Sequence, residues 1–228
     1  MAAEHFAGLD LGQNHDFTAL AMLEYLELKG EWDAARFAWR KKTALRLRYL
    51  ERMPLGTPYP DVVEEVAEAM HAPALAGRRY LMVDATGVGR PVVDMFRRAD
   101  LAGRMWPVQI TAGNRETLSD GYYGVPKRDL IVGLQVLLQA GRLQIASRIR
   151  GAEALVREMA EMRVRLTPGG HEKYGVWREG EHDDLVLAVA LACWGVGKIH
   201  RNVLSGDAGY WTAAEDVRLW PGMNQQRW

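Results

Sequence analysis

Apolar and polar positions along the chain alternate first with a period of two and later with a period near 3.6. Residues 6–12, 18–28 and 36–47 show the pattern of strands, and short polar turns separate them. Strands joined by such short turns favour an antiparallel meander. From residue 61 onward, segments with helical spacing alternate with short apolar strands. The pattern therefore predicts an α/β domain.

The remaining elements follow from the same periodicities and from flanking glycine and proline residues. We expect helices at 61–72, 91–101, 126–140, 152–162 and 183–195, strands at 79–85, 105–111 and 143–145, and a hairpin at 163–177. The last helix is apolar on nearly all sides, which indicates that several neighbours bury it. We assign residues 1–199 to one domain and residues 200–228 to an irregular tail that contains tryptophans.

Composition narrows the class of protein without indicating a function. Of the 228 residues, 48% are hydrophobic and 25% charged, as in ordinary globular domains. The 29 basic residues balance the 29 acidic ones, which argues against a chain that coats nucleic acid but allows a local basic strip. The single cysteine, Cys193, excludes an internal disulfide and a cysteine-rich zinc site. With no signal peptide and no apolar run of membrane-spanning length, we expect a soluble cytoplasmic protein.

Carboxylates interrupt or end three of the apolar elements. Asp10 lies in an apolar strand, and Asp84 ends another. Asp183 and Asp184 begin the most apolar helix, where Asp183 would share the inward face with Leu187. Each position alone has an ordinary explanation as a turn former or a helix cap. Together, these carboxylates carry negative charge that no Lys or Arg adjacent in sequence neutralises. They therefore indicate a bound cation.

All-oxygen ligands suit a hard ion such as Mg²⁺ or Mn²⁺. Such clusters support two-metal phosphodiester hydrolysis, in which one ion lowers the pKa of water and the other stabilises the leaving oxygen. We predict Asp10, Asp84 and Asp183 as catalytic residues. The predicted metal ligands are these three and Asp184, with Asp10 as the central ligand and Asp183 favoured over Asp184 for direct contact.

The segments that carry these carboxylates resemble one family. Residues 6–20, 81–89, 125–143 and 182–192 are similar to the nuclease domain of phage large terminase subunits. The likeness covers most of residues 5–195 and is most specific in the last segment. It implies an RNase H-like fold: a mixed β-sheet, in which an antiparallel three-strand meander is extended by parallel strands, flanked by helices.

The resemblance also implies a function. Large terminases cut concatemeric viral DNA during packaging, which implies a divalent-metal-dependent endonuclease with two Mg²⁺ or Mn²⁺ ions and double-stranded DNA as its substrate. The implied partners are a terminase ATPase domain, the small terminase and the portal, in the cytoplasm of a host cell. Large terminases also carry an ATPase motor whose phosphate-binding loop has the pattern Gly-x-x-x-x-Gly-Lys-Ser/Thr. The nearest stretch in this chain, Gly195 to Lys198, lacks the preceding spacing and is followed by Ile199 in place of Ser or Thr, so the chain lacks this loop. We therefore expect either an excised nuclease domain or a standalone relative.

A dense basic run is a candidate DNA-binding surface. It contains Arg40, Lys41, Lys42, Arg46, Arg48 and Arg52. In a strand, Arg40, Lys42, Arg46 and Arg48 would share one face and could follow a phosphate backbone. A charged edge strand that resists aggregation would show the same pattern. Lys127, at a helix start, is a further candidate for contact with DNA.

Three other interpretations remain open on the sequence alone. Another RNase H-like nuclease, such as a Holliday junction resolvase or an RNase H, would differ in its preferred substrate. An actin-like or sugar-kinase-like ATPase shares the superfold, but such proteins use two domains and carry Ser or Thr where this chain has Gln13 and Asn14. A scaffold without enzymatic activity would tolerate the loss of Asp10.

Overall fold

The structure is a computed structural model in which most of the chain is described. The described residues are 3–12, 16–87, 89–166, 172–175, 182–201, 203 and 210–211. Their helices are α1 (Tyr59–His71), α2 (Gly89–Arg98), α3 (Lys127–Gln139), α4 (Ala152–Glu161) and α5 (Asp184–Ile199), with a short 3-10 helix at Pro73–Leu75. Their strands are β1 (Glu4–Asp10), β2 (Ala19–Asp33), β3 (Ala38–Arg52), β4 (Arg78–Asp84), β5 (Arg104–Thr111), β6 (Thr117–Ser119), β7 (Tyr122–Pro126), β8 (Leu143–Ile145), β9 (Arg163–Leu166), β10 (Glu172–Gly175) and β11 (Tyr210–Trp211).

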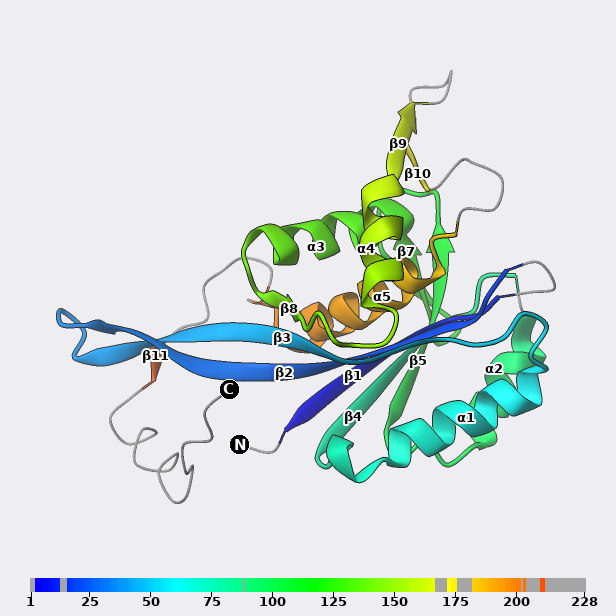
Figure 1. Ribbon diagram of the computed structural model, residues 1–228, viewed down its shortest axis with the longest axis horizontal. Helices are drawn as coiled ribbons and strands as arrows, with labels where there is room; N and C mark the ends of the chain where they lie inside the picture. Colours follow the sequence, from blue (N-terminus) through cyan, green and yellow to red (C-terminus); the bar gives the residue numbers. More distant parts are fainter. Residues whose placement is uncertain are drawn as a thin grey trace.

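The first three strands form the antiparallel meander that the sequence predicts. At one end of this meander, Asp10 of β1 lies opposite Ala19 of β2, which in turn lies opposite Arg52 of β3. At the other end, β2 and β3 continue as a long hairpin that extends beyond the body of the molecule (Figure 1). The register therefore places Arg52 two strands away from Asp10.

On the other side of β1 the next three strands, β4, β5 and β7, are parallel to it. β4 pairs with β1, β5 with β4 and β7 with β5, all in parallel, and α1 and α2 form crossovers that lead into β4 and β5. The described residues form a nine-stranded sheet in the order β11-β3-β2-β1-β4-β5-β7-β6, with β8 beside β3. A meander extended by parallel strands and flanked by helices confirms the predicted α/β architecture.

Helices cover both faces of this sheet (Figure 1). On one face α5 lies across the strands, with α3 and α4 beside it, over a core that includes Phe6 and Met82. On the other face α1 and α2 cover a second core that includes Leu9 and Phe96. Because side chains alternate between faces along a strand, Asp10 belongs to the same face of β1 as Phe6. The carboxylate of Asp10 is therefore on the α5 side of the sheet.

The absence of a side chain at residue 8 lets α5 lie directly against β1. A Cβ atom on Gly8 would be 2.0 Å from the carbonyl oxygen of Ala188 and 2.7 Å from the amide nitrogen of Ala192. Every residue from Asp184 to Cys193 is buried, which confirms that several neighbours enclose this helix. The close approach brings the first turn of α5 toward the ends of β1 and β4.

Three strands of the sheet, β6, β7 and β11, were not predicted. Strand β6 lies at the edge of the sheet and its three residues are exposed, whereas β7 lies between β5 and β6 and is partly buried. The hairpin predicted at 163–177 is present as the antiparallel pair β9 and β10. Among the described residues, no helix is long and apolar enough to cross a membrane.

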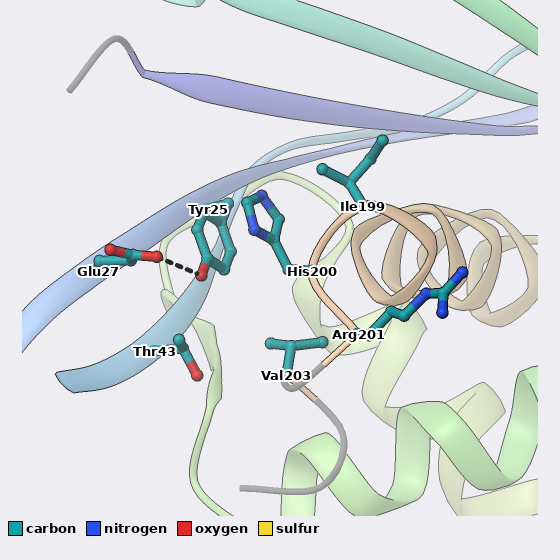
Figure 2. Close-up of a pocket in the computed structure, with 7 residues that line it drawn as sticks. All are labelled: Tyr25, Glu27, Thr43, Ile199, His200, Arg201 and Val203. Carbon is teal, nitrogen blue, oxygen red and sulfur yellow. Dashed lines mark hydrogen bonds between the residues drawn. The ribbon is translucent and has the colours of Figure 1, made fainter. Parts of the chain in front are cut away.

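The described part of residues 200–228 packs against the domain. Strand β11 pairs with β3 opposite Trp39 and Arg40. His200 stacks on Tyr25 with a ring separation of 3.8 Å, and Val203 is buried. These residues line a cavity of about 350 Å³ at the end of α5 (Figure 2). Trp220 and Trp228 lie outside the described residues, and the division at 199 stays a prediction.

Candidate metal centre

The carboxyl groups of Asp10 and Asp84 lie beside each other, and each acts on the pKa of the other. Leu9 of β1 pairs with Val83 of β4 in parallel register, so the two aspartates that follow are neighbours at the same edge of the sheet. The turn after β4 holds Asp84 in place, because the amide of Thr86 donates a hydrogen bond to its Oδ1 over 2.8 Å. This edge is where open α/β sheets place their ligands.

Asp10 is the electrostatic centre of the group. Its pKa is raised well above the ordinary value, first by loss of water around the carboxyl group and then by the negative charges of Asp84, Asp183 and Asp184. Burial also raises the pKa of Asp84, although hydrogen bonds from Thr86 oppose that shift. The charges of the three other predicted carboxylates therefore all act on Asp10. So much negative charge in one place requires a proton or a cation.

Asp183 and Asp184 differ in their surroundings. Helix α5 begins at Asp184, one residue after the predicted start, and Asp183 is its N-cap residue with φ −128° and ψ 15°. The carbonyl of Asp183 still accepts the helical hydrogen bond from the amide of Leu187 over 2.9 Å. The more deeply buried side chain is that of Asp184, which is 6% exposed, against 23% for Asp183. Asp183 nevertheless has the stronger effect on the pKa of Asp10. Because Asp183 acts more strongly on Asp10 than Asp184 does, we still favour Asp183 as the direct metal ligand. This assignment remains a proposal.

Two basic side chains neutralise this pair, and neither is adjacent to it in sequence. Lys127, the first residue of α3, places its Nζ 2.7 Å from Oδ2 of Asp183. Arg52, the last residue of β3, donates from Nε to Oδ2 of Asp184 over 2.7 Å and from Nη2 to Oδ1 over 3.3 Å. The sheet and the α3–α5 contact create these pairs, so sequence proximity could not reveal them.

Glu158 of α4 is a further acidic residue near the centre that the sequence predictions did not include. It is buried, its Oε1 forms an ion pair with Arg52, and its Oε2 accepts a hydrogen bond from the amide of Val186 over 3.1 Å. Burial and the negative charge of Asp184 raise the pKa of Glu158 to about 7. One signal could have found it: it lies three residues after Leu155, toward the buried side of an amphipathic helix.

An aromatic side chain covers the Arg52 side of the centre. The ring of Phe17 lies 5.0 Å from the guanidinium carbon of Arg52 and makes an edge contact with His182 at 4.9 Å. Both residues belong to segments that flank the carboxylates, in the turn before β2 and before α5.

The donor set fits a hard divalent cation. Asp10, Asp84, Asp183 and Asp184 supply carboxylate oxygens, which are the atoms that Mg²⁺ and Mn²⁺ prefer. The ammonium of Lys127 beside Asp183 offsets part of the negative charge of the group. Among the described residues, no three His, Cys, Asp or Glu side chains converge as a ready-made metal site. A cation bound by Asp183 would have to displace Lys127.

The predicted basic strip lies away from the carboxylates. Arg46 and Arg40 precede Arg52 by 6 and 12 residues along β3, which corresponds to about 20 Å and about 40 Å in an extended strand. Arg46 donates to the side chain of Gln144, and Arg40 and Arg48 form ion pairs with acidic residues of β2. Lys42 is exposed. The structure thus brings only Lys127, of the five predicted DNA-binding residues, to the carboxylate group.

No family description matches the sequence, and no curated protein matches it. Solved structures do match. The magnesium-bound large terminase nuclease of the thermophilic phage G20c has 21% identity and a TM-score of 0.57, over 84% of this chain and 81% of that one. The large terminase nuclease domain of Thermus phage P74-26 has 19% identity and a TM-score of 0.54, over 83% and 78%.

A third match comes from a different kind of virus. The manganese-soaked, inhibitor-bound terminase nuclease domain of human cytomegalovirus has 13% identity and a TM-score of 0.50, over 88% of this chain and 86% of that one. These likenesses confirm the predicted RNase H-like fold and the resemblance to terminase nuclease domains at the level of the fold.

Proposed function

We propose that this chain is a divalent-metal-dependent endonuclease that cuts double-stranded DNA. The observation that supports this most strongly is that Asp10 and Asp84 follow paired positions of β1 and β4, with the charges of Asp183 and Asp184 acting on Asp10. The fold shared with terminase nuclease domains, some of them crystallised with bound metal, agrees with it. The arrangement suits phosphodiester hydrolysis because that reaction builds negative charge which bound cations can offset.

Asp10 is proposed as the central ligand, since the other carboxylates surround it. Asp84 would hold a cation on the β4 side, and Asp183 with Asp184 on the α5 side. Two Mg²⁺ or Mn²⁺ ions bound in this way supply an attacking water of lowered pKa and offset the charge on phosphorus and on the leaving oxygen. We expect cleavage to leave 3′-hydroxyl and 5′-phosphate ends, with little sequence preference.

Lys127 is proposed to contact the DNA backbone. Its side chain is partly exposed, and its ammonium group forms an ion pair with Asp183. A cation bound by Asp183 would weaken that contact and leave the ammonium available to a phosphate oxygen. Arg40, Lys42, Arg46 and Arg48 would then contact DNA only beyond the cleavage site, where they would add affinity and no chemistry.

The biological setting is proposed from the same likeness. The matching structures are terminase nucleases and a terminase nuclease domain. We propose that this chain acts in viral genome packaging in the cytoplasm of a host cell, on concatemeric DNA. Its partners would be a terminase ATPase domain, a small terminase and a portal.

Incubation of supercoiled plasmid with the purified protein tests this function. We expect nicked and linear products with Mg²⁺ or Mn²⁺ and none with EDTA. Branched DNA and RNA–DNA hybrids, run in parallel, separate a packaging-type nuclease from a junction resolvase or an RNase H. Folded protein that cleaves no nucleic acid in any metal, but whose melting temperature rises with ATP, would contradict the proposal and favour the ATPase interpretation.

Replacing Lys127 with Gln should lower kcat/KM for plasmid cleavage by about 10- to 100-fold. A hydrogen bond to a charged group contributes roughly 1.5–3 kcal/mol, and about 1.4 kcal/mol corresponds to a tenfold change in rate. Lys42→Gln is the matched control, since it removes the same charge far from the carboxylates, and we expect a change below about threefold. Equal losses in the two variants would contradict the placement of Lys127 at the scissile phosphate.

A further inference from the structure

Helix α5 begins without the usual cap. The first amides of a helix have no partner within it, and an aspartate at the N-cap commonly accepts a hydrogen bond from one of them. Asp183 occupies the N-cap of α5 but makes no such bond. Its carboxylate turns instead toward Lys127 and acts on the pKa of Asp10.

A carboxylate from another helix provides the missing cap. Oε2 of Glu158, in α4, accepts the hydrogen bond from the amide of Val186, the third residue of α5. Its Oε1 forms the ion pair with Arg52, whose remaining N–H groups hold both oxygens of Asp184. All of these contacts are buried or partly buried, with Glu158 itself only 5% exposed.

We propose that Glu158 and Arg52 form a clamp that positions the Asp183–Asp184 pair for metal binding. Glu158 caps α5 in place of Asp183, so that the Asp183 carboxylate stays directed at the metal centre. Arg52 fixes the orientation of Asp184 and is itself held by Glu158. Both are positioning residues, and their role rests on the proposed function of the centre.

The choice of residue types agrees with this role. A guanidinium is planar and carries five donors, so one arginine can hold two carboxylates at once, which the single ammonium of a lysine does poorly. Without Glu158, the amide of Val186 would lose its acceptor, and an aspartate at the N-cap, the position of Asp183, commonly accepts such a bond. Loss of Glu158 should therefore withdraw Asp183 from the metal centre while leaving the chain folded.

The test is a titration of the full chain with MnCl₂, followed by the rise in melting temperature. The variants are Glu158→Ala, Glu158→Gln and Arg52→Lys, with Glu153→Ala as a control at an exposed position of the same helix. We expect Glu158→Ala and Arg52→Lys to raise the Mn²⁺ concentration at half-effect by about 10- to 100-fold, as is usual for residues that orient metal ligands. Glu158→Gln, which keeps an oxygen for the Val186 amide, should raise it less, and Glu153→Ala should match the unaltered protein.

The possible outcomes distinguish a failure of the clamp from a failure of the proposed function. If Glu158→Ala lowers the melting temperature without metal but titrates at the same Mn²⁺ concentration as the unaltered protein, Glu158 is merely structural and the clamp is refuted. If Glu158→Ala does not fold, the Mn²⁺ titration of Arg52→Lys provides the same test of the clamp. If the unaltered protein shows no response to Mn²⁺, the metal centre itself is refuted, and the clamp with it.

Discussion

Asp10→Asn is expected to abolish metal-dependent DNA cleavage and, at the same time, to stabilise the metal-free protein. The cleavage rate should fall by about 10³-fold or more, because bound cations contribute several kcal/mol to stabilisation of the transition state and about 1.4 kcal/mol corresponds to a tenfold change. Asparagine has nearly the shape of aspartate but cannot supply the central negative charge that such cations require.

Stability should change in the opposite direction. Loss of water by burial and then the charges of three other carboxylates raise the pKa of Asp10, so the folded chain holds this group at a cost in free energy. A neutral amide relieves that cost, and we expect the free energy of unfolding in EDTA to rise by about 0.5–2 kcal/mol. Plasmid cleavage and urea denaturation measure the two effects. A variant that is both inactive and less stable would indicate that Asp10 is a structural residue.

Gly8→Ala is the second change with a large expected effect, although residue 8 carries no functional group. The new Cβ would lie within 2.7 Å of backbone atoms of Ala188 and Ala192, which no rotation of a side chain can relieve. Overpacking of a core typically costs about 1–3 kcal/mol, and a contact with helix backbone belongs at the upper end of that range. Displacement of α5 would also move Asp183 and Asp184 away from Asp10, so cleavage should fall by more than the loss of folded protein explains.

Gly133→Ala provides the control for this prediction. Gly133 is in the interior of α3, and a Cβ there meets nothing within 4 Å. Alanine should therefore stabilise the protein by about 0.5–1 kcal/mol, since it disfavours the unfolded chain and favours helix. Urea denaturation of both variants, with cleavage rates per folded molecule, gives the comparison. Equal stability of Gly8→Ala and the unaltered protein would contradict the close contact between α5 and β1.

Much of the fold was predictable because its elements have strong local patterns. The alternation along β1, the apolar run of β4 and the apolar character of α5 predicted two strands and a buried helix, which the structure contains. The edge strand β6 was missed because its residues are exposed and show no apolar periodicity. Strand β11 consists of two residues and forms by pairing with β3. Because β3 is far away in the sequence, no local pattern could predict this strand.

The carboxylates of the candidate centre were predictable for a related reason. A charge at Asp10 or Asp84 contrasts with an apolar strand, and that contrast is visible in the sequence. Their partners were not predictable, because Arg52 and Lys127 are 132 and 56 residues away from the aspartates that they contact. The start of α5 was misplaced by one residue, since a helix boundary depends on backbone geometry that two successive aspartates do not reveal.

Crystals of the protein grown or soaked in MnCl₂, with anomalous diffraction recorded at the manganese edge, test the metal centre most directly. We expect manganese peaks between Asp10 and Asp84 and between Asp10 and the Asp183–Asp184 pair, with the ammonium of Lys127 moved away from Asp183. Crystals of Asp10→Asn should lack both peaks. Protein that cleaves DNA in Mn²⁺ but binds manganese elsewhere, or nowhere, would contradict the assignment of these four carboxylates to the metal centre.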